Sequence, residues 1–99
     1  MEVLFNDERL DKLESDPSYT AGWAPAIVKA YRRRMQMIRA APDERDFYEL
    51  RGLHFEKLKG KRSHQHSMRL NDQYRLVVEL LKDNPQGTIV KIVEIGDYH

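Results

Sequence analysis

The chain has 99 residues, enough for one domain with a single core and too few for two. Hydrophobic residues make up 40% and charged residues 33%, a balance that favours a folded chain over a disordered one. No apolar run approaches the roughly 18 residues of a membrane span, and the acidic start does not fit a secretory signal. The lack of cysteine excludes disulfides and thiolate metal sites and fits a reducing compartment. We therefore expect one cytoplasmic domain over residues 1–99.

The formal net charge of +1 hides a segregated charge pattern. Residues 21–41 contain five basic residues and no acidic one, and residues 51–75 contain seven basic residues and two acidic ones. Such segregation suggests one cationic surface that faces a polyanion. Acidic and basic blocks that neutralise each other within the fold are the alternative.

The first half of the chain predicts helices. Val3–Phe5 is a candidate edge strand, and a polar residue before position 8 can cap a short helix over residues 7–14. The clearest helix covers roughly residues 24–41, with Pro25 in its first turn, where the missing N–H has no partner in any case. Its apolar side chains fall on one arc and most basic ones on the other, which is typical of a surface helix. Residues 43–50 predict another short helix.

Arg34 is the exception in the long predicted helix, because it projects within the apolar arc. One explanation is a stem that lies along the rim of the core while the guanidinium reaches water. The other is a functional cation, or a partner for a carboxylate at the edge of the core.

The second half of the chain predicts strands. A polar basic loop is expected over residues 60–66, and Asn84-Pro85 and Gly87 mark the turn of the last hairpin. Helices followed by strands predict the α+β class, with N-terminal helices packed on a mostly antiparallel sheet of four to five strands. The expected strands in this half are His54–Leu58, Ser67–Asn71, Tyr74–Leu81 and Ile89–Ile95.

Motifs for metal binding and for a protein nucleophile are missing. His64 and His66 lie close together, but no third strong ligand follows them. The sequence also contains no glycine-rich phosphate loop and no nucleophile elbow. We therefore expect neither a metal nor another cofactor.

Basic residues in the second half are interspersed with aromatic and imidazole side chains. Cations hold phosphates and aromatic faces stack on unpaired bases, so this composition suits RNA. RNA supplies its own nucleophile, the 2′-OH, and cleavage then needs a base, an acid and cations that stabilise the phosphorane. A basic patch that binds RNA without cleaving it, or plain surface, is the alternative.

Three segments, in this order, resemble the HigB group of toxins in the RelE/ParE superfamily. The resemblance covers about the C-terminal half, and the first half is similar only in the order and length of its elements. The segments are FEKLKG (Phe55–Gly60), SMRLNDQYR (Ser67–Arg75) and IVEIGDYH (Ile92–His99).

The resemblance implies a RelE-like microbial RNase-type fold and the toxin of a type II toxin–antitoxin system. Such a toxin is a ribosome-dependent endoribonuclease that cleaves mRNA in the A site through 2′-OH attack and so inhibits translation. The resemblance also implies a HigA-type helix-turn-helix antitoxin as partner. Operator DNA would be bound only through the antitoxin complex, and no membrane is involved.

The site residues follow from the resemblance position by position. Lys59 matches the Lys of the family's Leu-Lys-Gly, and Arg75 matches the Arg after Asn-Asp-Gln-aromatic; both would contact the scissile phosphate. Asp97, Tyr98 and His99 match the terminal catalytic cluster. His99 would transfer a proton, Tyr98 would stack on or orient the nucleotide, and Asp97 would orient His99 or contact a base. Further RNA contacts are expected from Lys57, Lys61, Arg62 and Arg69.

The chain departs from the family pattern near Lys59. Some members have a His where Glu56 stands here, and His54 lies two residues earlier. Strand alternation puts Glu56 on the face opposite Lys57 and Lys59, so we transfer no acid/base role to it. The identity of the general base stays open. The basic loop with its two imidazoles also differs from the family pattern, which bears on RNA contacts.

His99 is the candidate general acid. An α-carboxylate on this residue would favour the imidazolium over the neutral ring, which predicts a partly protonated side chain near neutral pH. The alternative is a frayed last residue without function.

Two other functions are compatible with the residues. A toxin of the same fold can act by binding DNA gyrase, as ParE-like members do, without RNA chemistry. A catalytically inactive relative would bind only RNA or the antitoxin. The basic side of the long helix is a candidate surface for an acidic antitoxin segment or for ribosomal RNA.

Overall fold

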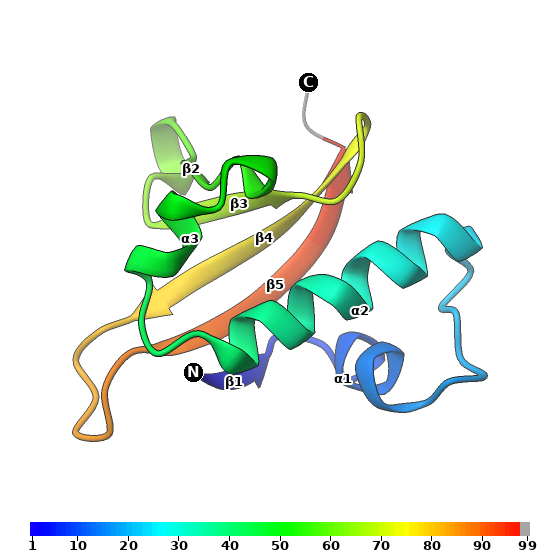
Figure 1. The fold of residues 1–99 in the computed structure, drawn as a ribbon, viewed down its shortest axis with the longest axis horizontal. Coiled ribbons are helices and arrows are strands. Elements are labelled where there is room, and N and C mark those ends of the chain that lie inside the picture. The colour runs from blue at the N-terminus through cyan, green and yellow to red at the C-terminus, as the bar shows by residue number, and fades with distance from the viewer. Residues whose placement is uncertain (98–99) are drawn as a thin grey trace.

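One sheet contains the strands of the second half and one strand from the start of the chain. The computed structural model describes residues 1–97, and its five strands lie in the order β1-β5-β4-β3-β2 (Figure 1). β1 is parallel to β5, and all other neighbours are antiparallel. The α+β class and the N-terminal edge strand are confirmed. The strands are β1 (Glu2–Phe5), β2 (Glu56–Lys57), β3 (Gln65–Arg69), β4 (Tyr74–Leu81) and β5 (Ile89–Asp97).

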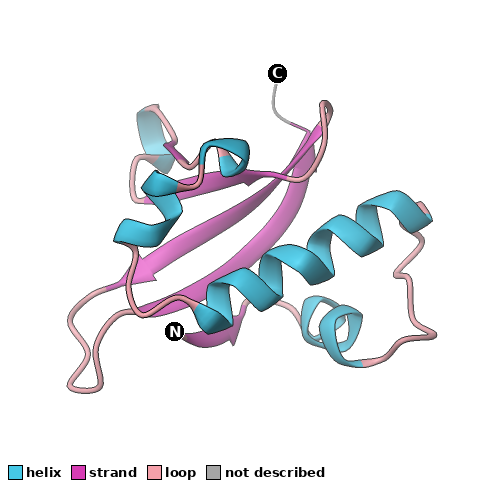
Figure 2. Cartoon of the chain, in the orientation of Figure 1, coloured by secondary structure: helices cyan, strands magenta, loops and turns pink. Residues whose placement is uncertain are grey.

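The helices lie on one face of this sheet (Figure 2). α2 crosses the face, α1 lies beside it near β1, and α3 lies on the β3 side (Figure 1). Within residues 1–97 no helix is both long enough and apolar enough to cross a membrane. The helices are α1 (Glu8–Ser15), α2 (Pro25–Ala40) and α3 (Arg45–Glu49), with 3-10 turns η1 (Arg51–Leu53) and η2 (Gly60–Arg62).

The two longer helices begin and pack as their sequences predict. The Asp7 carboxylate accepts from the backbone N–H of Arg9 at 2.8 Å and caps α1, while Pro25 opens α2. The hydroxyl of Tyr31 donates to the carbonyl of Leu10 at 2.7 Å and fastens α2 to α1. The apolar stripe of α2 is buried and includes Ile27, Val28, Tyr31, Met35 and Ile38.

Two arginines from the predicted solvent side of α2 make tertiary contacts instead. Arg39 forms two hydrogen bonds to the Glu14 carboxylate, at 2.6 and 2.7 Å. Arg32 binds carbonyl oxygens at the end of α1 and just beyond it, where the helix leaves such groups without internal partners. Its acceptors, at 2.9 to 3.1 Å, are the carbonyls of Leu13, Asp16 and Tyr19.

β4 is the central strand, and its alternation separates two faces. Leu76 and Val78 pack in the core beneath the helices. Val77 points to the other face, yet it is also fully buried. On that face the side chain of Arg62 reaches from η2 to the carboxylate of Glu94 on β5, at 2.6 Å. Because Glu94 is the pairing partner of Val77, this contact lies over the centre of the sheet.

The second half of β5 lacks the neighbouring strand β1 that its first half has. Val77 pairs with Glu94 and Val78 pairs with Ile92, so Val93 forms a β-bulge. β1 accompanies β5 only from Ile89 to Ile92. Among residues 1–97, the rest of β5 therefore has β4 on one side and no strand on the other.

The strand predicted over residues 54–58 is shorter in the structure. Only Glu56 and Lys57 form β2. The 3-10 turn η1 leads into His54, whose φ of 45° lies in the left-handed region. A non-glycine residue in this region interrupts an extended strand, and the sequence offers no glycine or asparagine here to signal it.

β3 begins earlier than predicted, at Gln65 instead of Ser67. The predicted loop over residues 60–66 therefore ends two residues sooner. The ring of His66 stacks on Phe55, with centroids 4.7 Å apart and an angle of 6° between the planes. Burial lowers the pKa of His66, and the nearby Glu44 opposes this shift. His66 is thus a packed ring at the edge of the core rather than a loop residue.

Candidate active site

Two arginines and a carboxylate lie at the turn end of the β3–β4 hairpin. Arg75 pairs with Arg69 across the hairpin and with Gly96 on the other side, next to Asp97. The structure therefore brings together three predicted site residues. Arg69 and Arg75 come from the segment Ser67–Arg75, and Asp97 comes from the segment Ile92–His99. A hollow of about 360 Å³ opens here and is lined by His54, Arg69, Asn71, Asp72 and Arg75.

Arg75 is held by fixed acceptors. Its Nε donates to the Ser67 hydroxyl at 2.7 Å, and its Nη2 donates to the Ser67 carbonyl at 3.2 Å. Nη2 also donates to the carbonyl of His54. Among residues 1–97 the Nη1 group has no acceptor, so it is available to an anion. Because the guanidinium is half-buried and fixed from two segments, it is oriented before any ligand binds.

The turn of the hairpin is tied to the end of β5. The Asn71 side-chain oxygen accepts from the backbone N–H groups of Gln73 and Tyr74, at 2.9 and 2.7 Å, and closes the turn. The Gln73 side chain donates to the Asp97 carboxylate at 3.1 Å. The turn therefore fixes both the entry to β4 and the last described residue of the chain.

Tyr98 and His99 lie outside the described residues, 1–97. Their predicted roles in stacking and proton transfer stay predictions. They follow directly on Asp97, which pairs with Tyr74 one position before Arg75.

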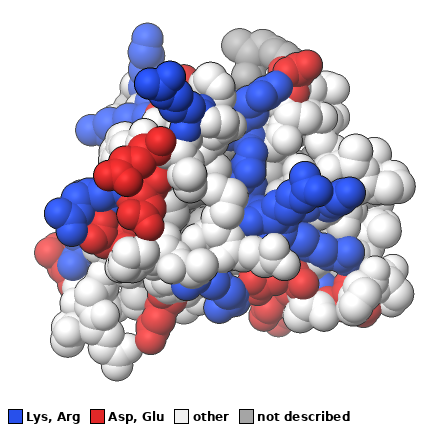
Figure 3. Space-filling view, in the orientation of Figure 1, with Lys and Arg blue, Asp and Glu red and all other residues white. Residues whose placement is uncertain are grey.

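A second group of cations adjoins the hollow. Arg34 of α2 donates from Nε to the carbonyl of Arg69 at 2.8 Å, so its acceptor belongs to the hairpin and is not a carboxylate. Burial lowers the pKa of Arg34, and the positive charges of Arg69 and Arg33 lower it further. The Arg69 guanidinium itself contacts the exposed carboxylate of Asp72. Lys and Arg form a band over α2 that extends towards the hairpin turn (Figure 3).

The predicted lysines lie near the other end of β3. The backbone N–H of Leu58 donates to the carbonyl of Gln65, which places Lys59 beside the start of β3. Arg75 pairs with Arg69 at its end. The two ends are about 13 Å apart along the strand. Lys57, Lys59 and Lys61 are exposed and are not brought into contact with Arg75.

The two residues of β2 point to opposite faces of the sheet. Glu56 pairs with Ser67, and Lys57 pairs with His66. Ser67 is the residue that holds Arg75, so Glu56 shares its face with Arg75 while Lys57 lies on the helix side. The prediction that Glu56 and Lys57 lie on opposite faces of the sheet is confirmed. The Glu56 carboxylate is therefore on the same face as Arg75.

Arg62 has acceptors within the sheet. It donates to the Gln65 side chain at 2.8 Å and to the Glu94 carboxylate at 2.6 Å. Its predicted contact with RNA would compete with these bonds. The Glu94 partner lies 32 positions away in the chain, and no local pattern indicates it.

Sequence reasoning missed the residues that position the charged groups. Ser67 and Gln73 have polar side chains that orient Arg75 and Asp97. Alternation along β3 puts Ser67 on the same face as Arg69, and this signal was available in the sequence. The contribution of the His54 carbonyl was not, because it depends on the left-handed backbone at that residue.

The arrangement suits the binding of a phosphodiester. Within residues 1–97 no group of three or more His, Asp and Glu side chains is placed to hold a metal. Arg69 and Arg75 lie side by side, and guanidinium groups match the geometry of phosphate oxygens. A phosphate in the hollow would lie next to the end of β5, where the predicted proton-transfer residues follow.

Comparisons with known proteins identify the family and the fold. Residues 3–98 match the family model of the RelE-like toxin HigB of type II toxin–antitoxin systems. Among solved structures, the chain is similar to a YoeB/ParE toxin from Agrobacterium tumefaciens, with a TM-score of 0.60, 15% identity and full coverage of both chains. At this identity the similarity concerns the fold. No curated protein sequence matches the chain.

Proposed function

The chain belongs to the HigB family of RelE-like toxins of type II toxin–antitoxin systems, and we propose that it is a ribosome-dependent endoribonuclease. In this proposal it cleaves mRNA in the A site and thereby inhibits translation. The observation that supports the proposal best is the fixed Arg75 guanidinium, whose Nη1 group has no acceptor among residues 1–97. Arg75 pairs with Arg69 on one side and with Gly96, near the end of β5, on the other.

The proposed chemistry uses the 2′-OH of the mRNA as nucleophile. Its oxygen attacks the adjacent phosphorus, and the bond to the 5′-oxygen of the next nucleotide breaks. Arg75 would bind the non-bridging oxygens and stabilise the extra charge of the phosphorane, with Arg69 beside it. His99 would protonate the departing 5′-oxygen, while Asp97 orients His99 or contacts a base. The exposed lysines around β2 would bind the RNA backbone at a distance from the scissile bond.

Two groups near Arg75 are candidates for the general base. Glu56 is exposed and lies on the same face of the sheet as Arg75, whereas Lys57 lies on the opposite face. His54 is among the residues that line the hollow, and its carbonyl accepts a hydrogen bond from Arg75. Replacing each residue in turn, as Glu56→Gln and His54→Gln, and comparing the pH profiles of cleavage would assign the base.

The family also implies an antitoxin partner. We propose a HigA-type helix-turn-helix antitoxin, through which the complex would bind operator DNA. The toxin would act in the cytoplasm, where ribosomes and mRNA are found.

Primer extension on mRNA bound to purified ribosomes tests the function. We expect cuts within codons in the presence of ribosomes and none on free mRNA. Inhibition of DNA supercoiling by gyrase without any cut would instead indicate the ParE-like mode. Absence of both effects would indicate an inactive relative. His99→Gln should abolish or strongly slow cleavage, and a wild-type rate for this variant would exclude His99 as the general acid.

A further inference from the structure

Asp97 lies opposite Tyr74 in a strand pair whose members share no backbone hydrogen bond. The carbonyl of Tyr74 accepts from the N–H of Leu70 at 3.0 Å, so Tyr74 directs its backbone groups to β3. Neighbouring residues alternate, and Arg75 therefore bonds with Gly96 on β5. In a pair without mutual backbone bonds the side chains lie closer together, on the same face of the sheet. The position of Asp97 therefore depends in part on the Tyr74 side chain.

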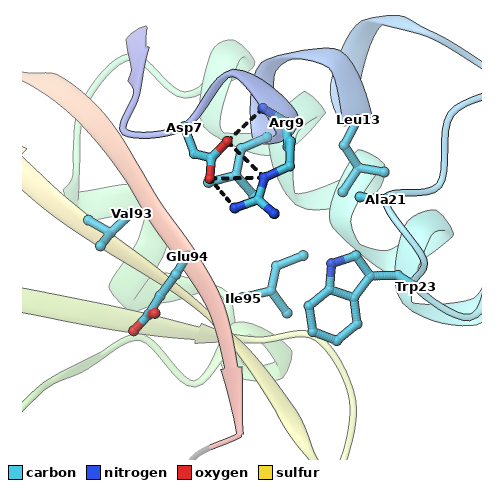
Figure 4. A pocket seen from close by; sticks show the side chains of 9 residues that line it. Asp7, Arg9, Leu13, Ala21, Trp23, Val93, Glu94 and Ile95 are labelled. Atoms are coloured by element: carbon cyan, nitrogen blue, oxygen red, sulfur yellow. Dashed lines mark hydrogen bonds and ion pairs between the residues drawn. The ribbon is translucent and has the colours of Figure 1, made fainter.

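Trp23 contacts Tyr74 on the helix side of the sheet. The two ring centroids are 5.2 Å apart and the planes are inclined at 77°, an edge-to-face arrangement that is favourable beyond its buried area. Both side chains are half-buried and pack against the core. In Figure 4 the Ile95 side chain also lies towards the indole, and Ile95 shares a face of β5 with Asp97. Trp23 therefore adjoins both neighbours of Asp97 on this face.

Packing alone does not fix the indole. A pocket of about 250 Å³ opens beside it, between β5, α1 and the loop that leads to α2 (Figure 4). Its lining includes Leu13 and Trp23, with the ion pair of Asp7 and Arg9. Because the pocket leaves space beside the indole, the backbone that carries Trp23 must help to hold it against Tyr74.

A strained turn provides this constraint. The N–H of Trp23 donates to the carbonyl of Thr20 at 2.9 Å, and the two residues between them, Ala21 and Gly22, have φ values of 52° and 81°. Positive φ at both central residues is the pattern of a type I′ turn. Glycine adopts it freely, whereas alanine does so at a cost. Ala21 is exposed, so burial of its side chain does not explain its conformation, and strained residues of this kind cluster at functional sites.

We propose that Trp23 is a positioning residue for RNA cleavage. Held by the turn from Thr20 to Trp23, the indole supports Tyr74 and Ile95 and thereby fixes Asp97 relative to Arg75. This inference rests on the proposed nuclease function, in which Asp97 orients His99 or contacts a base. Trp23 itself touches no reacting group. Its effect on the rate follows from geometry, because a misplacement of about 1 Å in an active site can slow a reaction about 10²-fold.

Cleavage by variants of the intact toxin tests the proposal on ribosome-bound mRNA. Trp23→Leu stays apolar but loses the aromatic contact, and we expect cleavage at saturating ribosomes to slow about tenfold or more with KM little changed. Trp23→Phe keeps an aromatic edge and should cleave within about threefold of the wild-type rate. Tyr19→Leu is the matched control, because Tyr19 is a half-buried aromatic residue of the same loop that lies beneath Lys12 instead of beside β4. It should cleave at the wild-type rate.

Circular dichroism and thermal unfolding identify a temperature at which all these variants are folded. A wild-type rate for folded Trp23→Leu at that temperature would overturn the proposal. Equal slowing by Trp23→Leu and Tyr19→Leu would also overturn it, because a general loss of stability would then explain both effects.

Variants of Ala21 test the turn without changing the indole. Ala21→Gly permits the positive φ and should cleave like the wild type. Ala21→Val disfavours this conformation, since a β-branched residue rarely adopts it, and should slow cleavage severalfold. A wild-type rate for Ala21→Val would overturn the role assigned to the turn.

A double-mutant cycle shows whether Trp23 acts through Asp97. Asp97→Asn should slow cleavage, and adding Trp23→Leu to it should slow cleavage by less than about twofold more, since the positioned group is already lost. Losses that multiply in the double variant would overturn the proposal, because they would mean that the two residues act independently.

Hydrogen–deuterium exchange measures the support of this strand end without RNA. The amide of Gly96, next to Asp97, should exchange about tenfold faster in Trp23→Leu than in the wild type and be unchanged in Tyr19→Leu. The amide of Glu94, which pairs with Val77 further along β5, is the internal reference. Unchanged exchange of Gly96 in Trp23→Leu would overturn the proposal. Faster exchange in this variant, together with a wild-type toxin that cuts no mRNA, would contradict the proposed function alone.

Discussion

Replacing Arg75 by glutamine tests whether one residue both stabilises the fold and binds the scissile phosphate. Arg75→Gln keeps a polar side chain of moderate length but loses the positive charge and most of the N–H donors of the guanidinium. Three hydrogen bonds are at stake, two to Ser67 and one to the His54 carbonyl. Charge-assisted bonds contribute about 1.5–3 kcal/mol each, and solvent screens this half-buried group.

We therefore expect the free energy of unfolding to fall by about 2 kcal/mol in total, the contribution of about one such bond, because solvent screens the group and the glutamine amide can replace part of the bonding. In a domain of this size 1 kcal/mol shifts Tm by about 4–8 °C, so Tm should fall by about 8–16 °C. Cleavage should fall further than stability, by about 10²–10³-fold, as for the loss of a donor that stabilises a developing anion. Calorimetry gives the first quantity, and primer extension at a temperature where the variant is folded gives the second.

Ser67→Ala is the matched control for this experiment. It removes the hydroxyl acceptor of Arg75 and leaves the cation in place. It should cost about 1 kcal/mol of stability and change cleavage only severalfold. A folded Arg75→Gln protein that cuts ribosome-bound mRNA at the wild-type rate would refute the role of this guanidinium. Equal loss of cleavage in both variants would mean that the hydroxyl, and not the charge, is required.

Three further predictions concern the scaffold around the site. Arg32→Met removes three bonds to carbonyls and should speed amide exchange in the loop after α1, whereas the exposed Arg33→Met should not. Tyr31→Phe removes the buried bond to the Leu10 carbonyl and should lower the free energy of unfolding by about 1 kcal/mol in urea titrations, and no change would contradict a contribution of this bond. Burial lowers the pKa of His66 below its ordinary 6.5, so the unfolded chain takes up this proton more readily and stability should decrease as pH falls below 6.5. His66→Phe keeps the stack and should reduce this decrease in urea unfolding above and below that pH; an unchanged pH dependence would contradict the assignment.

Local patterns predict most elements of the fold. The apolar arc of α2, the proline in its first turn and the β-rich runs depend on neighbours within a few residues, and periodicity detects these. The same alternation predicts that Glu56 and Lys57 lie on opposite faces. The resemblance of short motifs likewise indicates the family, because it needs only their order along the chain.

The parts of the candidate site that sequence reasoning did not find depend on long-range contacts or on unusual backbone. The bond between Arg62 and Glu94 joins η2 to β5 and occupies a cation predicted to bind RNA. The left-handed backbone of His54 shortens β2 and brings a carbonyl to Arg75. The bulge at Val93 determines which backbone groups of β5 face outward, and no residue type in that run marks it.

The crowding of Arg33, Arg34 and Arg69 also has a consequence for the behaviour of the purified protein. Burial lowers the pKa of the half-buried Arg34, and the positive charges of Arg69 and Arg33 lower it further, so the mutual repulsion of these groups opposes folding. Dissolved salt screens such repulsion, so higher ionic strength should stabilise this chain, whereas it weakens ordinary surface ion pairs. Sulfate and phosphate, which bind guanidinium groups in pairs, should raise Tm more than chloride at equal ionic strength. Storage and crystallisation conditions rich in these anions therefore suit this toxin.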